Sequence, residues 1–198
     1  MKLAGETEAN LIIRHQKCIN AHFQPALGDF KSGQYIPDLP FSGYYSFEPA
    51  AGSLFAGIFV ASVDMEIDRL AVNIASPADE GKSLRLGIYA CRADLYPGTL
   101  ILDAGTASAS EAGTREIAIN QILKRGYYYL AVLLENPCGL NYLKLAQSPL
   151  GMYPAMSAVF AGYGCEPGWG ELPLEFPSGA TASNVMKMVI ARVARFVQ

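Results

Sequence analysis

The chain has few charged residues: they make up 17% of its 198 residues, while hydrophobic residues make up 51%. Disordered chains show the opposite balance, so this sequence is expected to fold. It also has no long apolar run. Its longest nearly apolar stretches, 54–63 and 127–134, are far shorter than the ~20 residues that a membrane-spanning helix requires. We therefore expect a soluble globular protein, and the shortage of surface charge points to assembly with other subunits.

Residues that commonly carry catalysis are scarce as well. The two histidines, His15 and His22, lie near the N-terminus, far in sequence from any nucleophile in the rest of the chain. There is no G-x-S-x-G nucleophile elbow and no G-x-x-x-x-G-K-S/T phosphate loop. The four cysteines are widely spaced and form no C-x-x-C pair, which argues against a zinc pattern or a dense disulfide framework. We predict that the protein is not an enzyme and needs no cofactor.

Positive charge is too sparse for a nucleic-acid partner. The net charge is −3, and no basic stripe is large enough to neutralise several phosphates. The one basic segment, 184–198, is interpreted as a solvated edge. No apolar stretch follows the first residues as it would in a secretory signal peptide, so we expect assembly in a host cytoplasm without export or membrane insertion.

Short strands separated by turns are predicted from Tyr44 onwards. The stretches 84–90 and 114–121 alternate apolar and polar side chains, which is typical of half-buried strands. The stretch 126–134 is apolar on both faces and is expected at the centre of a sheet. Further strands are predicted at 44–47, 54–60, 99–103 and 155–160.

One of these strands contains a change of phase. Met65 and Ile67 are spaced for one face, whereas Leu70 and Val72 are spaced for the other, which predicts a β-bulge near Asp68.

Two glycines predict irregular backbone nearby. Gly105 indicates a bulge or a close approach of backbone within its strand. Pro97 followed by Gly98 suits a type II turn over 96–99, because proline fixes the first central φ and glycine accepts the second.

The two ends of the chain are ambiguous. Residues 1–43 contain a possible short helix after Thr7 or an extended arm, followed by a loop rich in proline and glycine over 24–40. Residues 185–197 fit either a helical face or a strand, and their valines and isoleucine favour the strand. The fold class predicted is all-β: a two-sheet antiparallel β-sandwich, jelly-roll-like, over 44–198, with an N-terminal extension over 1–43.

Two loops supply candidate ligand contacts. The glycine-rich segment 162–170 is either a flexible surface loop or a ligand loop that displays Tyr163 and Trp169, the only tryptophan. Planar aromatic rings can stack on the apolar faces of sugars at little entropic cost. Together with Asp94 and Tyr96, these residues are our candidate glycan contacts.

Three carboxylates recur at every second position: Asp64, Glu66 and Asp68. On a strand they would share one face about 7 Å apart, an arrangement that could attract a cation such as Ca²⁺. A solvated or edge-protecting acidic face explains them better, so we predict no metal site and keep the three residues as a weak candidate only. A glycosidase pair made of Glu66 and Asp68 would meet only the distance requirement.

Taken in order, several runs of the sequence resemble a β-sandwich module of tailed-bacteriophage structural proteins, found mostly in tail fibres, spikes and other adsorption parts. The runs are IDRLAVN (67–73), LRLGIY (84–89), YPGTLILDAGT (96–106), GTREI (113–117) and GYYYLA (126–131). The resemblance covers about three quarters of the chain and carries no catalytic residues. It implies a non-enzymatic virion component of the tail or adsorption apparatus that forms a homo-oligomer, a trimer by analogy.

Three functions are therefore weighed. The first is an adsorption protein that binds a host surface glycan or receptor and docks to other virion proteins through residues 1–43. The second is a capsid decoration or head-fibre protein that stabilises the shell. The third is a glycan-active enzyme on a jelly-roll scaffold.

Overall fold

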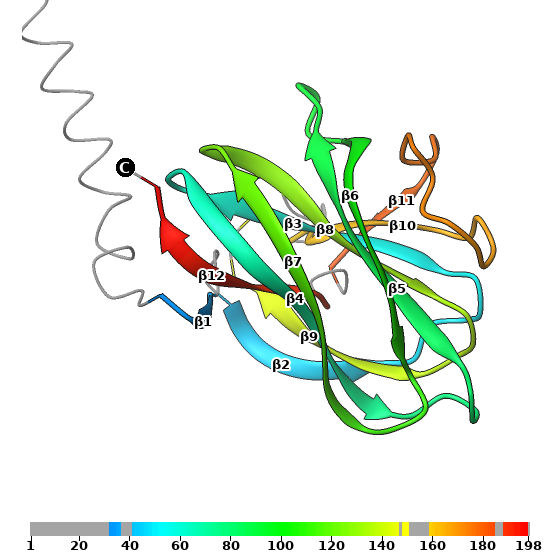
Figure 1. The fold of residues 1–198 in the computed structure, drawn as a ribbon. Coiled ribbons are helices and arrows are strands. Elements are labelled where there is room, and N and C mark those ends of the chain that lie inside the picture. The colour runs from blue at the N-terminus through cyan, green and yellow to red at the C-terminus, as the bar shows by residue number, and fades with distance from the viewer. Residues whose placement is uncertain (1–31, 37–40, 147, 151–158, 185–187, 198) are drawn as a thin grey trace, which may run out of the picture. The chain divides into compact units, whose positions relative to one another are not determined.

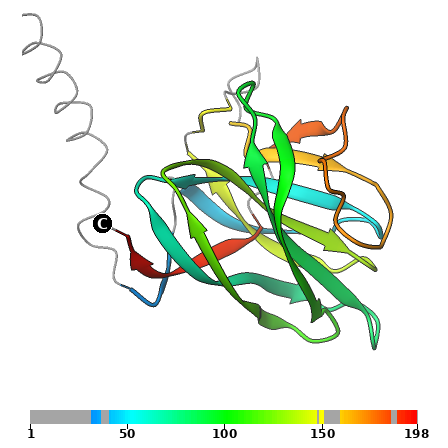
Figure 2. The same ribbon diagram turned by 45° about the horizontal axis from the view of Figure 1, so that its top comes forward.

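The strands of this protein pair into two antiparallel sheets, seen in a computed structural model that describes residues 32–36, 41–146, 148–150, 159–184 and 188–197 (Figure 1). The sheets lie face to face as a β-sandwich (Figure 2), so the predicted all-β class is confirmed. Within the described ranges there is no helix, and hence none long and apolar enough to cross a membrane.

Sheet A has the order β1-β12-β4-β9-β2, with β7 also paired to β4. Because β7 runs along most of β4, the strands β12 and β9 share the other side of β4. The strands of sheet A are β1 (Gln34–Ile36), β2 (Phe41–Phe47), β4 (Met65–Ser76), β7 (Gly113–Leu123), β9 (Gly139–Leu145) and β12 (Ile190–Phe196).

Sheet B has the order β11-β10-β3-β8-β5-β6. Its central strands are β3, buried along nearly its whole length, and β8, buried from Tyr129 to Leu134 in line with the apolar run over 126–134. The strands of sheet B are β3 (Leu54–Ala61), β5 (Ser83–Cys91), β6 (Pro97–Ser108), β8 (Gly126–Leu134), β10 (Gly162–Cys165) and β11 (Thr181–Ser183).

The core between the sheets is made by the side chains that the alternation predicts. Leu84, Leu86 and Ile88 of β5 are completely buried, and so are Leu70 and Leu140 of sheet A. Because polar and apolar positions alternate along β5 and β7, each strand presents one face to this core and the other away from it. The predicted alternation is therefore confirmed for both strands.

Both predicted bulges are present. Along the β4–β12 pair, Arg69 lies opposite Arg192 but Ile67 lies opposite Val193, so Asp68 is the extra residue on β4, and the register with β7 also shifts there. Along the β5–β6 pair the register shifts next to Gly105, which has a φ of 88°. Glycine accepts this left-handed conformation without the steric cost that a side chain adds.

The predicted type II turn over 96–99 is wrong. Pro97 already belongs to β6, and the residue with positive φ is Leu95, at 62°. The chain instead reverses over 92–95, just before the predicted turn, where the Leu95 N–H donates to the Arg92 carbonyl at 3.0 Å. The Asp94 carboxylate accepts from the N–H of Tyr96 at 3.2 Å, so side-chain bonding supports the tight turn in place of the Pro-Gly pair.

The domain limits also differ from the prediction. The compact unit begins at Ser32, and β1 and the start of β2 lie inside the segment we assigned to an arm. Tyr35 pairs with Arg192 of β12, which explains why this part belongs to the sandwich. The rest of the predicted arm, 1–31 and 37–40, lies outside the described residues, as does most of the strand predicted over 155–160. At the other end, β12 confirms the strand interpretation of the C-terminal segment.

Candidate functional site

Residues 166–180, which we call the strap, join β10 to β11 (the orange loop in Figure 2) and pack on part of the outer face of sheet B. The Leu100 N–H donates to the Leu174 carbonyl at 2.8 Å, and the Phe176 N–H donates to the Gly98 carbonyl at 3.0 Å. These bonds attach the strap to β6. Because β6 and β10 lie near opposite edges of sheet B, the strap must cross the strands between them.

An aromatic layer lies beneath the strap. Tyr89 of β5 meets Phe176 of the strap edge to face, with ring centroids 5.2 Å apart. Tyr163 of β10 contacts both Tyr129 and Tyr96, at 6.1 and 4.7 Å between centroids. Tyr89 and Tyr129 are completely buried and Phe176 is 5% exposed, so this layer is a second small core outside the sandwich.

Tyrosine hydroxyls fasten the covering loops to sheet B. The Tyr89 hydroxyl donates to the Pro173 carbonyl at 2.9 Å, and the Tyr96 hydroxyl donates to the Pro177 carbonyl at 2.6 Å. The Tyr129 hydroxyl donates to the carbonyl of Leu95, the residue with positive φ. Burial raises the pKa of Tyr89 and of Tyr129, so both hydroxyls stay protonated donors at physiological pH.

The four predicted glycan contacts do not form one site. The rings of Tyr96 and Tyr163 pack against each other, which occupies surfaces that a sugar would need. The carboxylate of Asp94 pairs with Arg92 at 2.9 Å. Trp169 belongs to the strap and is 40% exposed, and the N–H of the preceding residue, Gly168, donates to the Gly52 carbonyl. The structure thus packs Tyr96 and Tyr163 in one layer, leaves the Asp94 side chain exposed in the neighbouring turn, and places Trp169 apart from the ring contacts of that layer.

The acidic triplet is not gathered into a metal site. Asp64 pairs with Lys124 at 2.9 Å, and Glu66 pairs with Arg195 at 2.6 Å.

Asp68 receives two bonds from Arg192, at 2.9 and 2.6 Å. The hydrogen bond from Lys124 lowers the pKa of Asp64, and those from Arg192 lower the pKa of Asp68. In the part of the chain that is described, no three His, Cys, Asp or Glu side chains are placed to hold a metal ion.

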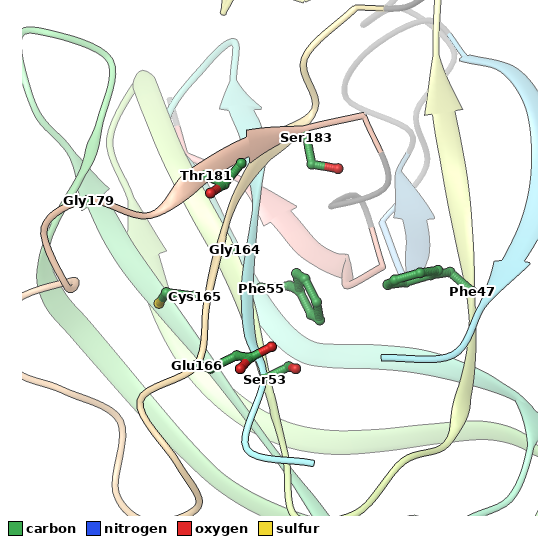
Figure 3. A pocket seen from close by; sticks show the side chains of 9 residues that line it. All are labelled: Phe47, Ser53, Phe55, Gly164, Cys165, Glu166, Gly179, Thr181 and Ser183. Atoms are coloured by element: carbon green, nitrogen blue, oxygen red, sulfur yellow. The ribbon is translucent and has the colours of Figure 1, made fainter. Parts of the chain in front are cut away.

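A cleft of about 550 Å³ opens where β2 of sheet A faces β3, β10 and β11 of sheet B (Figure 3). Phe55 lies in the middle of this view, with hydroxyl side chains from β11 on one side and a carboxylate and a serine on the other. The residues that line the cleft are Phe47, Ser53, Phe55, Gly164, Cys165, Glu166, Gly179, Thr181 and Ser183.

Alternation along β10 explains why the cleft exists. Phe55, Gly164 and Thr181 are aligned across three neighbouring strands, so the middle position of the row carries no side chain. Tyr163, between Gly162 and Gly164, points to the opposite face and joins the aromatic layer. The Gly-Tyr-Gly run therefore sends its ring outward and leaves space on the inner face.

The chemistry of the cleft combines apolar rings with hydrogen-bonding groups. Phe47 and Phe55 meet edge to face at 6.2 Å, and Phe47 remains 39% exposed. Thr181, Ser183 and Glu166 supply hydroxyls and one carboxylate. Burial raises the pKa of the Cys165 thiol to about 11, so it is not the thiolate that a nucleophile requires.

This cleft was not among the sites that the sequence predicts. The segment 162–170 drew attention for its aromatic residues, whereas its contribution to the cleft comes from the glycines between them. The available signal was the alternation of glycine and tyrosine over 162–164 in a segment that proves to be a strand.

No family model matches the chain, and no curated protein matches it in sequence. Among solved structures, the chain is similar to the cysteine protease and lectin-like domains of Cwp84, a surface-layer-associated protein of Clostridium difficile. The identity is 12% and the TM-score 0.45, over 78% of this chain and 36% of that one. A clostridial Cwp84 structure after propeptide cleavage gives 13% identity and a TM-score of 0.46, over 77% and 40%. The match therefore spans well under half of those chains.

Proposed function

We propose that this chain is a non-catalytic glycan-binding module that works in the adsorption apparatus of a tailed phage or phage-like particle. The observation that carries the binding role is the cleft of Figure 3, where exposed aromatic surface meets hydroxyl and carboxylate groups. A cleft of this volume is within the range of small-ligand sites, which combine apolar walls with a few polar groups that fix orientation.

Sugars match this combination of groups. The apolar face of a pyranose ring can pack on the partly exposed ring of Phe47, while its hydroxyls bond to Thr181 and Glu166. A ligand of this kind needs no reactive group, and the cleft offers none: its one thiol, Cys165, has a raised pKa.

The carboxylates that we considered for glycoside hydrolysis support the same proposal. A glycosidase needs a carboxyl group with a raised pKa as its general acid. The pKa of Asp68 is lowered instead, because Arg192 donates two hydrogen bonds to it. Glu66 is occupied by Arg195, so the Glu66–Asp68 pair is suited to holding β12 against β4.

The phage setting rests on the sequence resemblance alone. In that setting the protein resides in the virion, docks to other virion proteins through its N-terminal segment and forms a homo-oligomer, for which a trimer is the proposed state. A capsid decoration role is the second candidate in the same setting. Image reconstruction of a particle that carries the protein would decide between them: copies on the capsid lattice would overturn the adsorption role.

The binding role is tested with the full chain and host surface polysaccharide. We expect binding that weakens by about tenfold or more, about 1.4 kcal/mol, in Phe47→Ala. Tyr44→Ala is the matched control, because Tyr44 lies on the same strand but its hydroxyl bonds to Asn73 on the other face of sheet A. Trp169→Ala tests whether binding depends on the tryptophan that the sequence suggested or on the cleft. Chain shortening that is abolished by Glu66→Gln would contradict the non-catalytic role.

A further inference from the structure

We infer that the cleft selects uncharged glycans and rejects acidic ones such as those rich in uronic or sialic acids. This inference rests on the proposed glycan-binding function and specifies the class of ligand. It comes from the distribution of charge around the cleft.

The segments that build the cleft contain no cation. Its lining residues come from 47–55 and 164–183, and the sequence has no lysine, arginine or histidine over 32–68 or over 145–186. The only charged side chain in the lining is Glu166. An acidic sugar placed in the cleft would therefore meet a carboxylate and no balancing cation from the lining.

Several cations elsewhere in the described structure are engaged by other groups. Lys144 is the basic residue on the strand next to β2, and its Nζ lies 5.8 Å from the centroid of the Tyr45 ring. Its backbone pairs with Gly43, four residues before Phe47, and it is not among the residues that line the cleft. Arg192, Arg195 and Lys124 are engaged by the acidic triplet.

Glu166 acts on the two kinds of glycan in opposite ways. A carboxylate accepts hydrogen bonds from sugar hydroxyls, and such charge-assisted bonds are stronger than bonds between neutral groups. The same carboxylate repels a carboxylate on the ligand, and this repulsion is strongest at low salt, where ions screen it least. Selectivity thus comes from an attractive contact with one class and a repulsive contact with the other.

The test uses the full chain with soluble polysaccharides that differ in charge. Neutral probes are a glucan, a mannan and a galactan, and acidic probes are carboxymethyl glucan and polygalacturonate. Binding is measured by affinity electrophoresis and by the fluorescence of Trp169, the only tryptophan. We expect at least one neutral probe to bind and its acidic counterpart to bind at least about tenfold more weakly at low salt.

Two variants that each remove one negative charge show where the selectivity arises. Glu166→Gln should weaken neutral binding by about tenfold and reduce the discrimination against acidic probes. Glu171→Gln removes the same charge from an exposed strap position outside the cleft lining and should change neither quantity. Thermal unfolding of both variants verifies that they fold.

The outcomes separate the two proposals. If an acidic probe binds as tightly as the neutral ones and Phe47→Ala abolishes that binding, the charge selectivity is wrong and the glycan-binding role stands. If Glu171→Gln and Glu166→Gln have equal effects, selectivity comes from overall charge and the inference is also wrong. If no polysaccharide binds, including the host surface polymer, the glycan-binding role itself fails.

Discussion

The two sheets of this sandwich stabilise their outer faces in different ways. The outer face of sheet A is polar: Arg69 pairs with Glu116 at 3.7 Å, and Asn73 donates to Thr114 at 3.1 Å. The outer face of sheet B is aromatic around Tyr89 and Tyr129, and the strap covers this part of it. The polar side chains on the outer face of sheet A interact with water and with each other. The aromatic side chains of sheet B are buried under a second layer of the same chain.

This difference changes how the low charge content should be interpreted. We first took 17% charged residues as a sign of partner subunits. Part of the apolar excess is instead used within the chain, because Tyr89, Tyr129 and Phe176 are buried outside the main core. Coverage of the N-terminal segment by partners stays a prediction.

The largest expected effect comes from removing the strap's main anchor. Phe176→Ala should lower the free energy of unfolding by about 3–5 kcal/mol, because a buried ring is lost and a cavity remains. Leu174→Ala, two residues away and 78% exposed, should change it by less than about 0.5 kcal/mol. Urea unfolding measures both. Equal effects would mean that the strap is not packed on sheet B.

A smaller effect is expected from adding a methyl group under the strap. A Cβ at Gly87 would lie 2.3 Å from a Leu172 methyl and 2.7 Å from the Leu102 carbonyl oxygen. Gly87→Ala should therefore destabilise by about 1–3 kcal/mol through overpacking. Gly81→Ala is not a suitable control, since Gly81 has positive φ. Ser46→Ala, at an exposed position of β2 in sheet A, should be nearly neutral, and a large loss there would contradict the contrast between the faces.

Alkaline pH should lower the stability of the fold through a buried tyrosine of sheet B. Burial raises the pKa of the Tyr129 hydroxyl in the folded protein. Below about pH 10 the hydroxyl is protonated in both the folded and the unfolded state. Above that pH the unfolded chain loses the proton first, which favours unfolding. Stability should fall as the pH rises beyond 10.

Tyr129→Phe should cost about 1 kcal/mol at neutral pH, because its bond to Leu95 is lost. The variant should also lose less stability than the parent between pH 10 and 11. Tyr127→Phe, at an exposed position of the same strand, is the control. Identical alkaline profiles for Tyr129→Phe and the parent would show that this hydroxyl does not titrate on unfolding.

Acid pH should weaken an ion pair of sheet A, and this is the smallest of the expected effects. Arg192 lowers the pKa of Asp68 through its hydrogen bonds, so this pair stabilises the fold above about pH 4 and the contribution is lost as the pH falls. Asp68→Asn should shift the urea midpoint slightly at pH 7 and not at pH 2. A difference that persists at pH 2 would assign the effect to packing at the bulge.

Local pattern was enough to predict the sandwich. Alternation located β5 and β7, and the change of phase located the bulge at Asp68, because a period of two is a direct consequence of strand geometry. The pattern identifies two faces for a strand but does not say what covers the second one. The segment 162–170 is therefore expected as a surface or ligand loop, and nothing in the pattern predicts that the strap continues to Leu172 and Phe176, which are buried.

Partners far apart in sequence could not be predicted in the same way. Asp68 and Arg192 are 124 positions apart, so the acidic stretch and the basic C-terminal segment were interpreted separately. Pairing of β12 with β4 brings them together and explains both. The cleft has the same origin, since it needs β2 of one sheet to face β10 and β11 of the other.

The position of β12 has a consequence for synthesis. It follows every other described strand, yet it lies between β1 and β4 in sheet A. Until the ribosome has released it, β1 has no partner in the sheet and one side of β4 is open along 65–71. An unpaired strand edge is a template for aggregation, and such distant pairings close slowly. The nascent chain should thus depend on chaperones until β12 has emerged from the ribosome, and ribosome-bound chains stalled before β12 should be sensitive to protease.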